Sequence, residues 1–193
     1  PALAWSPEPT PATDGQKMAA ASACADGAAQ AAGSVRGDAS GSVTPSAPPP
    51  LVGLELHGTG AIAILADATA VGYCLLRSDG DDFVYGGLVY GLPESASAGS
   101  LVLGGMSTEF EGSEVGLLFG AAPAGVTSVR LDGGPGDGGV ATVADGRFAI
   151  WIPGSLADPA MEVVGLDATG IEVVRQALLT GEKLIDGMST RAP

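Results

Sequence analysis

The stretch GVTSVRLDGGPGDGGVATVADGRFAIWI, residues 125–152, decides the fold class of this chain. Its residues 127–131 alternate between apolar and polar side chains, which is the period-two pattern of a strand with one buried face. Residues 133–139 are GGPGDGG, with little side chain to pack and much freedom at positive φ. The chain is therefore expected to reverse direction there.

Two more strands are predicted within the same stretch. Residues 140–144 lead into Asp145-Gly146, a two-residue signal for a type I′ hairpin. Residues 147–152 then return as a strand, which Pro153-Gly154 ends because proline cannot donate to an interior ladder. The three strands together are typical of a β-meander.

The same kind of pattern continues in both directions along the chain. After the quoted stretch, residues 160–166 and 171–175 predict a hairpin around a turn at Asp167-Ala168-Thr169-Gly170. Before it, we expect six more strands, at residues 51–57, 61–66, 70–77, 83–90, 101–104 and 115–119.

These segments predict a mostly-β protein, either an antiparallel β-sandwich or two small packed β units, with one short N-terminal helix. The 31 glycines and 14 prolines fit short strands joined by frequent turns. We place the first β unit at residues 51–120 and the second at residues 121–180. A flexible tail is expected at residues 181–193.

The N-terminal part of the chain divides into three segments. Residues 1–13 hold four prolines and no periodicity, so they are expected to form an extended linker. Residues 14–33 are rich in alanine and predict a short helix packed on the sheet, with Met18, Ser22 and Ala25 on one side. Residues 34–50 predict a Gly/Ser/Pro loop.

The formal net charge is −14, from 22 acidic and 8 basic residues. A surface of this sign repels phosphate backbones, so nucleic acid is not an expected partner. No uncharged apolar run reaches the roughly 18 residues of a membrane-spanning helix, so we expect no membrane insertion by this segment. Because the chain starts at Pro1 without a basic and then apolar leader, any anchor is expected to lie outside this sequence.

The two cysteines, Cys24 and Cys74, permit a single intramolecular pairing. We predict a disulfide, which closes a loop of about 50 residues and adds about 4 kcal/mol of stability in the chain-entropy model. The alternative is a pair of buried reduced thiols in a cytosolic protein.

His57 is the one histidine in the sequence and the one candidate for a neutral-pH base of the usual kind. It falls on the polar face of a predicted strand, and no serine lies in a G-x-S-x-G elbow. We therefore expect a solvent-exposed histidine. A hydrolase that uses His57 would require the ring to be buried beside a serine and an acid.

Two groups of acidic residues could supply ligands or catalytic carboxylates. Asp79, Asp81 and Asp82 place oxygen atoms in a glycine-containing turn and are the candidate calcium ligands, although the spacing departs from an EF-hand. Glu109, Glu111 and Glu114 are clustered as glycosidase carboxylates would be, but a solvated acidic loop is the favoured interpretation.

Trp151 lies on the strand face opposite Phe148 and Ile150. It either belongs to a second core or marks a binding surface for a ligand such as a carbohydrate, and the core is the favoured interpretation.

The order of these elements resembles a group of uncharacterised actinobacterial proteins that carry a membrane anchor and an extracytoplasmic domain. The resemblance covers roughly residues 16–175 and rests on these segments: Cys24 in an alanine-rich helix, residues 49–52 leading into LELHGTGAIAILADA, Tyr73-Cys74-Leu75, residues 125–129 and residues 143–154. It implies an exported domain tethered to the outer face of a membrane, extracellular or at the cell surface. It brings no activity or catalytic residues.

The expected function is that of a non-enzymatic extracytoplasmic interaction or sensory ectodomain without a cofactor. Its expected partner is an unknown protein or a component of the cell envelope. The alternatives are a surface module that binds calcium or carbohydrate and, second, a hydrolase that uses His57.

Overall fold

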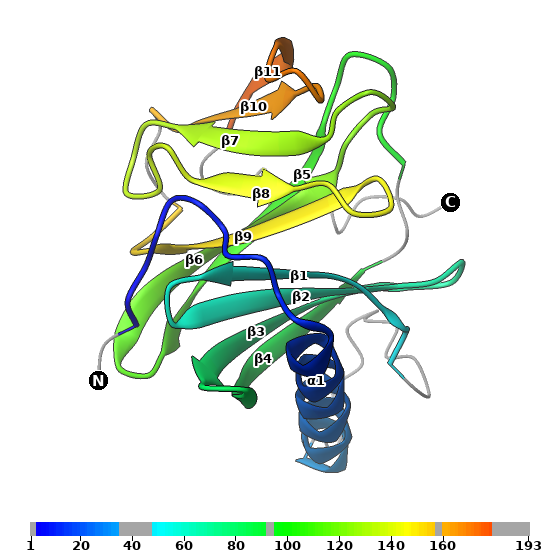
Figure 1. Ribbon diagram of the computed structural model, residues 1–193, viewed down its shortest axis with the longest axis vertical. Coiled ribbons are helices and arrows are strands. Elements are labelled where there is room, and N and C mark those ends of the chain that lie inside the picture. The colour runs from blue at the N-terminus through cyan, green and yellow to red at the C-terminus, as the bar shows by residue number, and fades with distance from the viewer. Residues whose placement is uncertain (1–2, 35–47, 92–94, 157–159, 179–193) are drawn as a thin grey trace. The chain divides into compact units, whose positions relative to one another are not determined.

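The computed structural model describes residues 3–34, 48–91, 95–156 and 160–178, and it divides the chain into two units, Pro1–Glu94 and Ser95–Pro193 (Figure 1). The fold is mostly β, with three antiparallel sheets and one helix in this part of the chain, which confirms the predicted fold class. Most of the expected Gly/Ser/Pro loop and the whole expected tail lie outside the described residues.

The first unit contains one sheet of four strands in sequence order. The strands are β1 (Leu51–His57), β2 (Gly60–Ala66), β3 (Val71–Asp79) and β4 (Asp82–Gly91), each antiparallel to the next. Asp67 shapes the turn between β2 and β3, because its Oδ1 accepts hydrogen bonds from the Thr69 amide and hydroxyl and from the Ala70 amide. Short local bonds of this kind favour a turn over continued strand.

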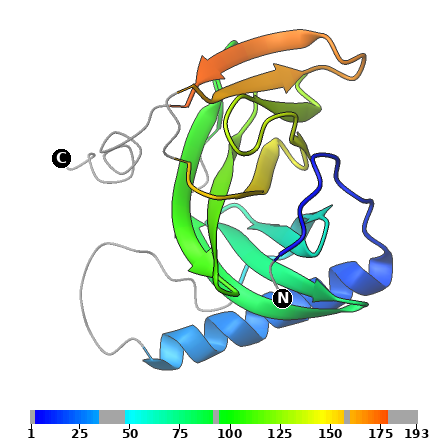
Figure 2. The ribbon, with the colours of Figure 1, turned by 90° about the vertical axis from the view of Figure 1, so that its left-hand side faces the viewer.

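Helix α1 (Asp14–Ser34) lies along the sheet of the first unit (Figure 2). A capping box begins it, since Gln16 N–H donates to the Thr13 hydroxyl and Thr13 N–H donates to the Gln16 side chain. The buried helix positions include Ala20, Cys24 and Gly27, which are four and three residues apart.

The predicted helix face was wrong, because Met18 is 71% exposed. Small residues form the buried face instead, and they let the helix backbone approach the sheet. Ala20 and Cys24 pack in one cluster with Leu56, Ala61, Ala63, Leu65, Cys74 and Leu76 of strands β1 to β3.

The second unit contains two sheets. Strands β5 (Val102–Phe110), β6 (Ser113–Ala121) and β9 (Arg147–Pro153) form one of them in the order β5-β6-β9. The other has the order β11-β10-β7-β8 and consists of β7 (Ser128–Asp132), β8 (Val140–Thr142), β10 (Glu162–Leu166) and β11 (Glu172–Ala177).

The predicted β-meander was wrong in its last pairing. The turn forms as expected, with Asp145 and Gly146 at φ 50° and 69° and with Ala144 and Arg147 exchanging two backbone hydrogen bonds. Beyond this one bridge the strands diverge, because β9 pairs along seven residues with β6 and belongs to the other sheet. A turn signal locates a reversal and does not fix how far the pairing extends.

The same pairing moves the boundary between the two units. We expected the first β unit to extend to residue 120, but β5 and β6 belong to the second unit, which begins at Ser95. The partner of β6 lies about 30 residues later in the sequence, at Arg147–Pro153. Sequence neighbours therefore do not define the unit.

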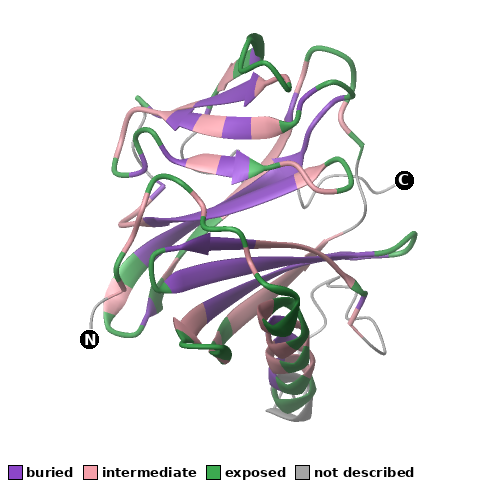
Figure 3. Cartoon of the chain, in the orientation of Figure 1, coloured by how far each residue is buried: buried purple, intermediate pink, exposed green. Residues whose placement is uncertain are grey.

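Long buried runs occur in strands β2 and β9 (Figure 3). Strand β2 is buried along its whole length, and so are Phe148 to Ile152 of β9. Both faces of these strands are covered, so their sequences do not show the alternation of a half-wet strand.

Candidate functional site

Cys24 and Cys74 form the predicted disulfide, with 6.1 Å between their Cα atoms. The bond joins α1 to β3, and both residues are 0% exposed. On β3, Cys74 lies between Ala63 of β2 and Leu88 of β4 in the ladder. The bond therefore fixes the helix to the centre of the sheet.

Within the described residues, no helix has the length and apolar character needed to cross a membrane.

His57, expected to be exposed, is 0% exposed, so that prediction was wrong. The strand pattern is as expected, with Glu55 and His57 on the face opposite Leu54 and Leu56. The interpretation of that face as wet was the error, because Glu55 is also only 7% exposed.

Part of the cover over His57 comes from the N-terminal strap, residues 4–10. Trp5 stacks on the imidazole with 6.5 Å between ring centroids, and His57 Nδ1 lies 2.8 Å from the Ser6 carbonyl oxygen. Thr10 N–H donates to the Leu56 carbonyl at the edge of β1. The expected linker is thus a docked segment, because its backbone groups find partners on an edge strand.

A second contact holds the strap at the turn between β1 and β2. Thr59 N–H donates to the Ala4 carbonyl at 2.9 Å, and Ala4 N–H donates to the Thr59 hydroxyl at 2.8 Å. Gly58 has a φ of 70°, and a Cβ at this position would overlap the Ala4 carbonyl. The turn therefore requires glycine both for its backbone conformation and for the passage of the strap.

The imidazole lies between two acceptors. Since a carbonyl can only accept, the neutral ring carries its proton on Nδ1 and directs it to Ser6. Nε2 lies 3.8 Å from Oε2 of Glu55, beyond hydrogen-bond distance. Burial lowers the pKa of His57 below its ordinary value of 6.5, and the Ser6 carbonyl and the charge of Glu8 act in the opposite direction.

This arrangement does not supply the nucleophile of a hydrolase. A histidine that activates serine needs the hydroxyl within hydrogen-bond reach of a ring nitrogen. The Ser6 hydroxyl donates instead to the Glu8 carbonyl at 2.9 Å, and only the Ser6 carbonyl meets the ring. With a fully covered ring, the His57 site has the features of a structural contact.

The candidate calcium ligands lie where β3 turns into β4. Asp79 and Asp82 pair across the end of the ladder, and Asp81 is in the turn between them. All three are exposed. Nowhere in the described ranges are three or more histidine, cysteine, aspartate or glutamate side chains grouped so that they could hold a metal ion. The turn sequence brings the carboxylates near in the chain without converging their oxygens.

Trp151 is a core residue, 0% exposed on β9. The favoured interpretation is confirmed, and the alternative of a binding surface at Trp151 was wrong. Strand β9 is covered on both faces, so its position opposite Phe148 and Ile150 does not bring it to solvent. Trp151 therefore cannot serve as the aromatic platform that the carbohydrate-binding alternative requires.

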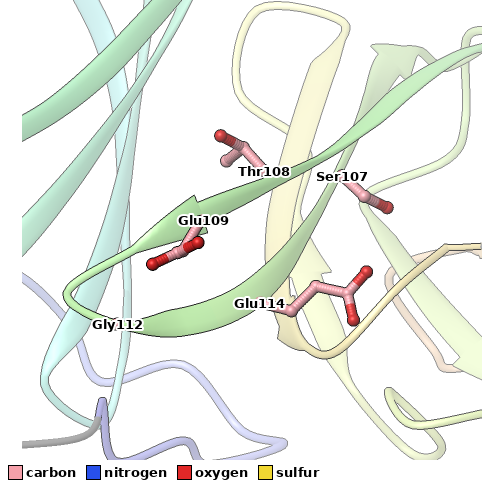
Figure 4. Close-up of a pocket in the computed structure, with 5 residues that line it drawn as sticks. All are labelled: Ser107, Thr108, Glu109, Gly112 and Glu114. Atoms are coloured by element: carbon pink, nitrogen blue, oxygen red, sulfur yellow. The ribbon is translucent and has the colours of Figure 1, made fainter.

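The hairpin of β5 and β6 carries an open hollow of about 470 Å³ (Figure 4). Ser107, Thr108, Glu109, Gly112 and Glu114 line it, and all except Thr108 are exposed. The Ser107 hydroxyl is engaged within the fold, because it accepts a hydrogen bond from Leu156 N–H and lies 3.2 Å from the Ser155 hydroxyl. The hollow therefore presents mainly carboxylates and a hydroxyl to solvent.

Two glutamates of this hairpin face each other in the ladder. Glu109 pairs directly with Glu114, and like charges in this position reduce the stability of a sheet. Between them, Glu111 has a φ of 53°, which is unfavourable for a residue with a side chain. The tip of the hairpin thus keeps three negative charges at a cost in stability.

The sequence contained weak signals for the docked strap and for the opposed pair of glutamates, although neither feature was predicted. A tryptophan in a proline-rich segment indicates a docked segment, since an exposed indole leaves apolar area in water. The turn at Glu111-Gly112 sets the register that opposes Glu109 and Glu114, as a two-residue hairpin requires.

Comparison with protein-family models, with curated proteins and with solved structures found no significant match.

Proposed function

We propose that this chain is an exported, non-enzymatic interaction or sensory domain. The disulfide between Cys24 and Cys74 carries the proposal, because such bonds persist in oxidising compartments and are kept reduced in the cytosol. The bond lies in the core of the first unit and joins its helix to its sheet. This position favours a structural role over a catalytic or redox one, since exchange requires access of a thiolate to sulfur.

The resemblance to anchored actinobacterial proteins supports a location at the outer face of a membrane. In this proposal, a segment outside this sequence supplies the anchor. The net charge of −14 is compatible with an exposed domain that stays apart from anionic lipid and nucleic acid.

The hairpin of β5 and β6 is the proposed contact surface. It is open, polar and negative, and Glu109 and Glu114 repel each other when no cation lies between them. A lysine or arginine side chain of a protein or cell-envelope component would relieve this repulsion, so binding and local stability would be coupled. An open hollow of this kind suits a side chain of a large partner better than an enclosed small molecule.

The proposed location is tested by the oxidation state of the cysteines in the source cells. The cells are quenched with acid and the protein is denatured, and its thiols are then labelled with a polyethylene glycol maleimide, with and without prior reduction. We expect no adduct without reduction and two adducts after it. A chain that reacts at both cysteines without reduction would contradict export.

The contact surface is tested by binding of the purified chain to envelopes isolated from the same cells. The double variant Glu109→Gln/Glu114→Gln removes the proposed surface, and Asp81→Asn/Asp82→Asn removes the same charge from another exposed turn. We expect only the first variant to lose binding. Equal binding by both variants and the unmodified chain would exclude the hairpin.

A further inference from the structure

The N-terminal strap covers an ionisable side chain, His57, to which we have assigned no catalytic role. His57 is 0% exposed, Trp5 stacks on its ring, and Nδ1 lies on the Ser6 carbonyl. Both of these contacts come from the strap itself. The strap belongs to neither the sheet nor the helix, so it can leave without breaking a strand pair of the sheet.

The charged groups around the imidazole determine what a second proton would meet. Glu55 of β1 faces Nε2 at 3.8 Å, and Glu8 belongs to the strap. Arg77 of β3 is in the same ladder row as His57, through Gly60 of β2, and so shares its face of the sheet. The positive charge of Arg77 disfavours protonation of His57, whereas the negative charges of Glu55 and Glu8 favour it.

A second proton has no well-placed acceptor in the closed arrangement. Nδ1–H already donates to Ser6, so the added proton goes to Nε2, where the Glu55 oxygen lies beyond hydrogen-bond distance. A buried imidazolium whose N–H lacks a hydrogen bond raises the free energy of the closed state. If the ring is uncovered, water accepts that hydrogen bond.

We infer that the N-terminal strap is an acid-released cover, docked on β1 while His57 is neutral and released when the imidazole becomes doubly protonated. The disulfide keeps α1 on the sheet, so release is confined to the chain before the helix. Release exposes the edge of β1 at the carbonyl of Leu56, together with the imidazolium of His57 and the side chain of Glu55. This inference goes beyond the proposed interaction role, because release needs no partner.

Trp5 reports directly on the strap. The chain has two tryptophans, and Trp151 is buried in the second unit, so the difference between the unmodified chain and Trp5→Phe isolates the Trp5 emission. We expect this difference signal to change between about pH 8 and about pH 4.5, with a midpoint below that of free histidine, while far-ultraviolet circular dichroism stays constant. A constant Trp5 signal up to global acid unfolding would overturn the inference.

Two variants test whether His57 is the titrating group. His57→Asn keeps a donor near the Nδ1 position and cannot titrate, so we expect it to abolish the transition. Glu8→Gln removes a charge that favours the imidazolium, so we expect the midpoint to fall. A transition that survives in His57→Asn, or a midpoint that Glu8→Gln leaves unchanged, would assign the response to other groups and overturn the inference.

Hydrogen exchange gives a test that needs no variant. The amides of Thr10 and Thr59 donate to Leu56 and Ala4, so their protection, corrected for intrinsic rates, should fall in acid while that of β2 is retained. Simultaneous loss in β2 would mean unfolding of the unit and would contradict a local release. Since the purified chain is used alone, failure here leaves the oxidation-state test of the proposed function unaffected.

Discussion

Gly27 of helix α1 lies so close to Tyr85 of strand β4 that a Cβ on the glycine would overlap the tyrosine ring. In the sequence, a glycine at the middle of an alanine-rich helix weakens the helix prediction. In the fold, it allows the helix and the aromatic side chain to meet. Glycine lowers the intrinsic stability of the helix, but it permits the close approach of helix and sheet that the disulfide then fixes.

Gly27→Ala is therefore expected to destabilise the protein by about 1–3 kcal/mol, as overpacking does in a tight interface. Denaturant unfolding followed by circular dichroism measures the change. The control is Gly15→Ala in the same helix, where the nearest atom to an added Cβ is 3.8 Å away and the exchange is expected to be neutral or stabilising. Equal effects of the two substitutions would show that propensity alone decides.

The disulfide is expected to contribute about 4 kcal/mol, because it closes a loop with a sequence separation of 50 residues. The double variant Cys24→Ala/Cys74→Ala should lower the urea midpoint by the corresponding amount, less any residual structure in the unfolded state. Addition of a reductant to the variant should then have no further effect. An unchanged midpoint in the double variant would remove the structural role of the bond.

The stability of the protein should fall as the pH decreases below about 6.5, the pKa of an unfolded histidine. Because burial lowers the pKa of folded His57, the unfolded chain binds more protons in this range, and stability is lost until the pH passes below the folded pKa. Urea unfolding at several pH values measures the slope.

His57→Asn is the control for this pH dependence, and it should flatten the upper part of the slope. The pKa values of Asp67 and Asp167 are lowered first of all by hydrogen bonds from Thr69 and Thr169. Their stabilising effect is present above the unfolded carboxyl pKa and is lost only at lower pH. A variant that keeps the full slope above about pH 5 would contradict the assignment to His57.

Neutralising one glutamate of the β5–β6 hairpin should stabilise the second unit. Glu109 and Glu114 are directly opposed, so Glu109→Gln is expected to raise the free energy of unfolding by roughly 0.2–1 kcal/mol at low ionic strength. High salt should reduce the gain, because exposed charges are screened. Thermal unfolding in low and high salt measures both effects.

The gain from the second substitution tests the cause. If repulsion between the pair is responsible, Glu109→Gln/Glu114→Gln adds little to Glu109→Gln alone, since the interaction is already removed. Two independent and equal gains would instead indicate a response to the net charge of −14.

The strands themselves were readable from the sequence because the signals for them are local. Alternation at residues 127–131 and the turn at Asp145-Gly146 identified β7 and the reversal before β9. The pairing was not readable, since hydrogen bonds of β9 go to β6 and not to the strand that precedes it. Which strand completes a ladder depends on the packing of the whole unit.

The candidate site divides in the same way. The pairing of the cysteines followed from composition, because two cysteines allow one intramolecular bond, but the alternative of two reduced thiols was excluded only by the bond in the structure. The exposure of His57 did not follow, because a polar residue on an alternating strand has the same pattern whether water or a docked segment covers it. Asp79, Asp81 and Asp82 were near in sequence without being brought together around an ion.

Local sequence signals were sufficient for the fold class, the approximate places of most strands and the one possible cysteine pairing, because periodicity and turn chemistry act over short range and two cysteines allow a single pair. Only the tertiary structure decided that Trp5 covers His57, that Gly27 meets Tyr85 and that Trp151 is buried. These relationships join residues that are far apart along the chain. Their free energies come from burial and close packing, which exist only after the chain has folded.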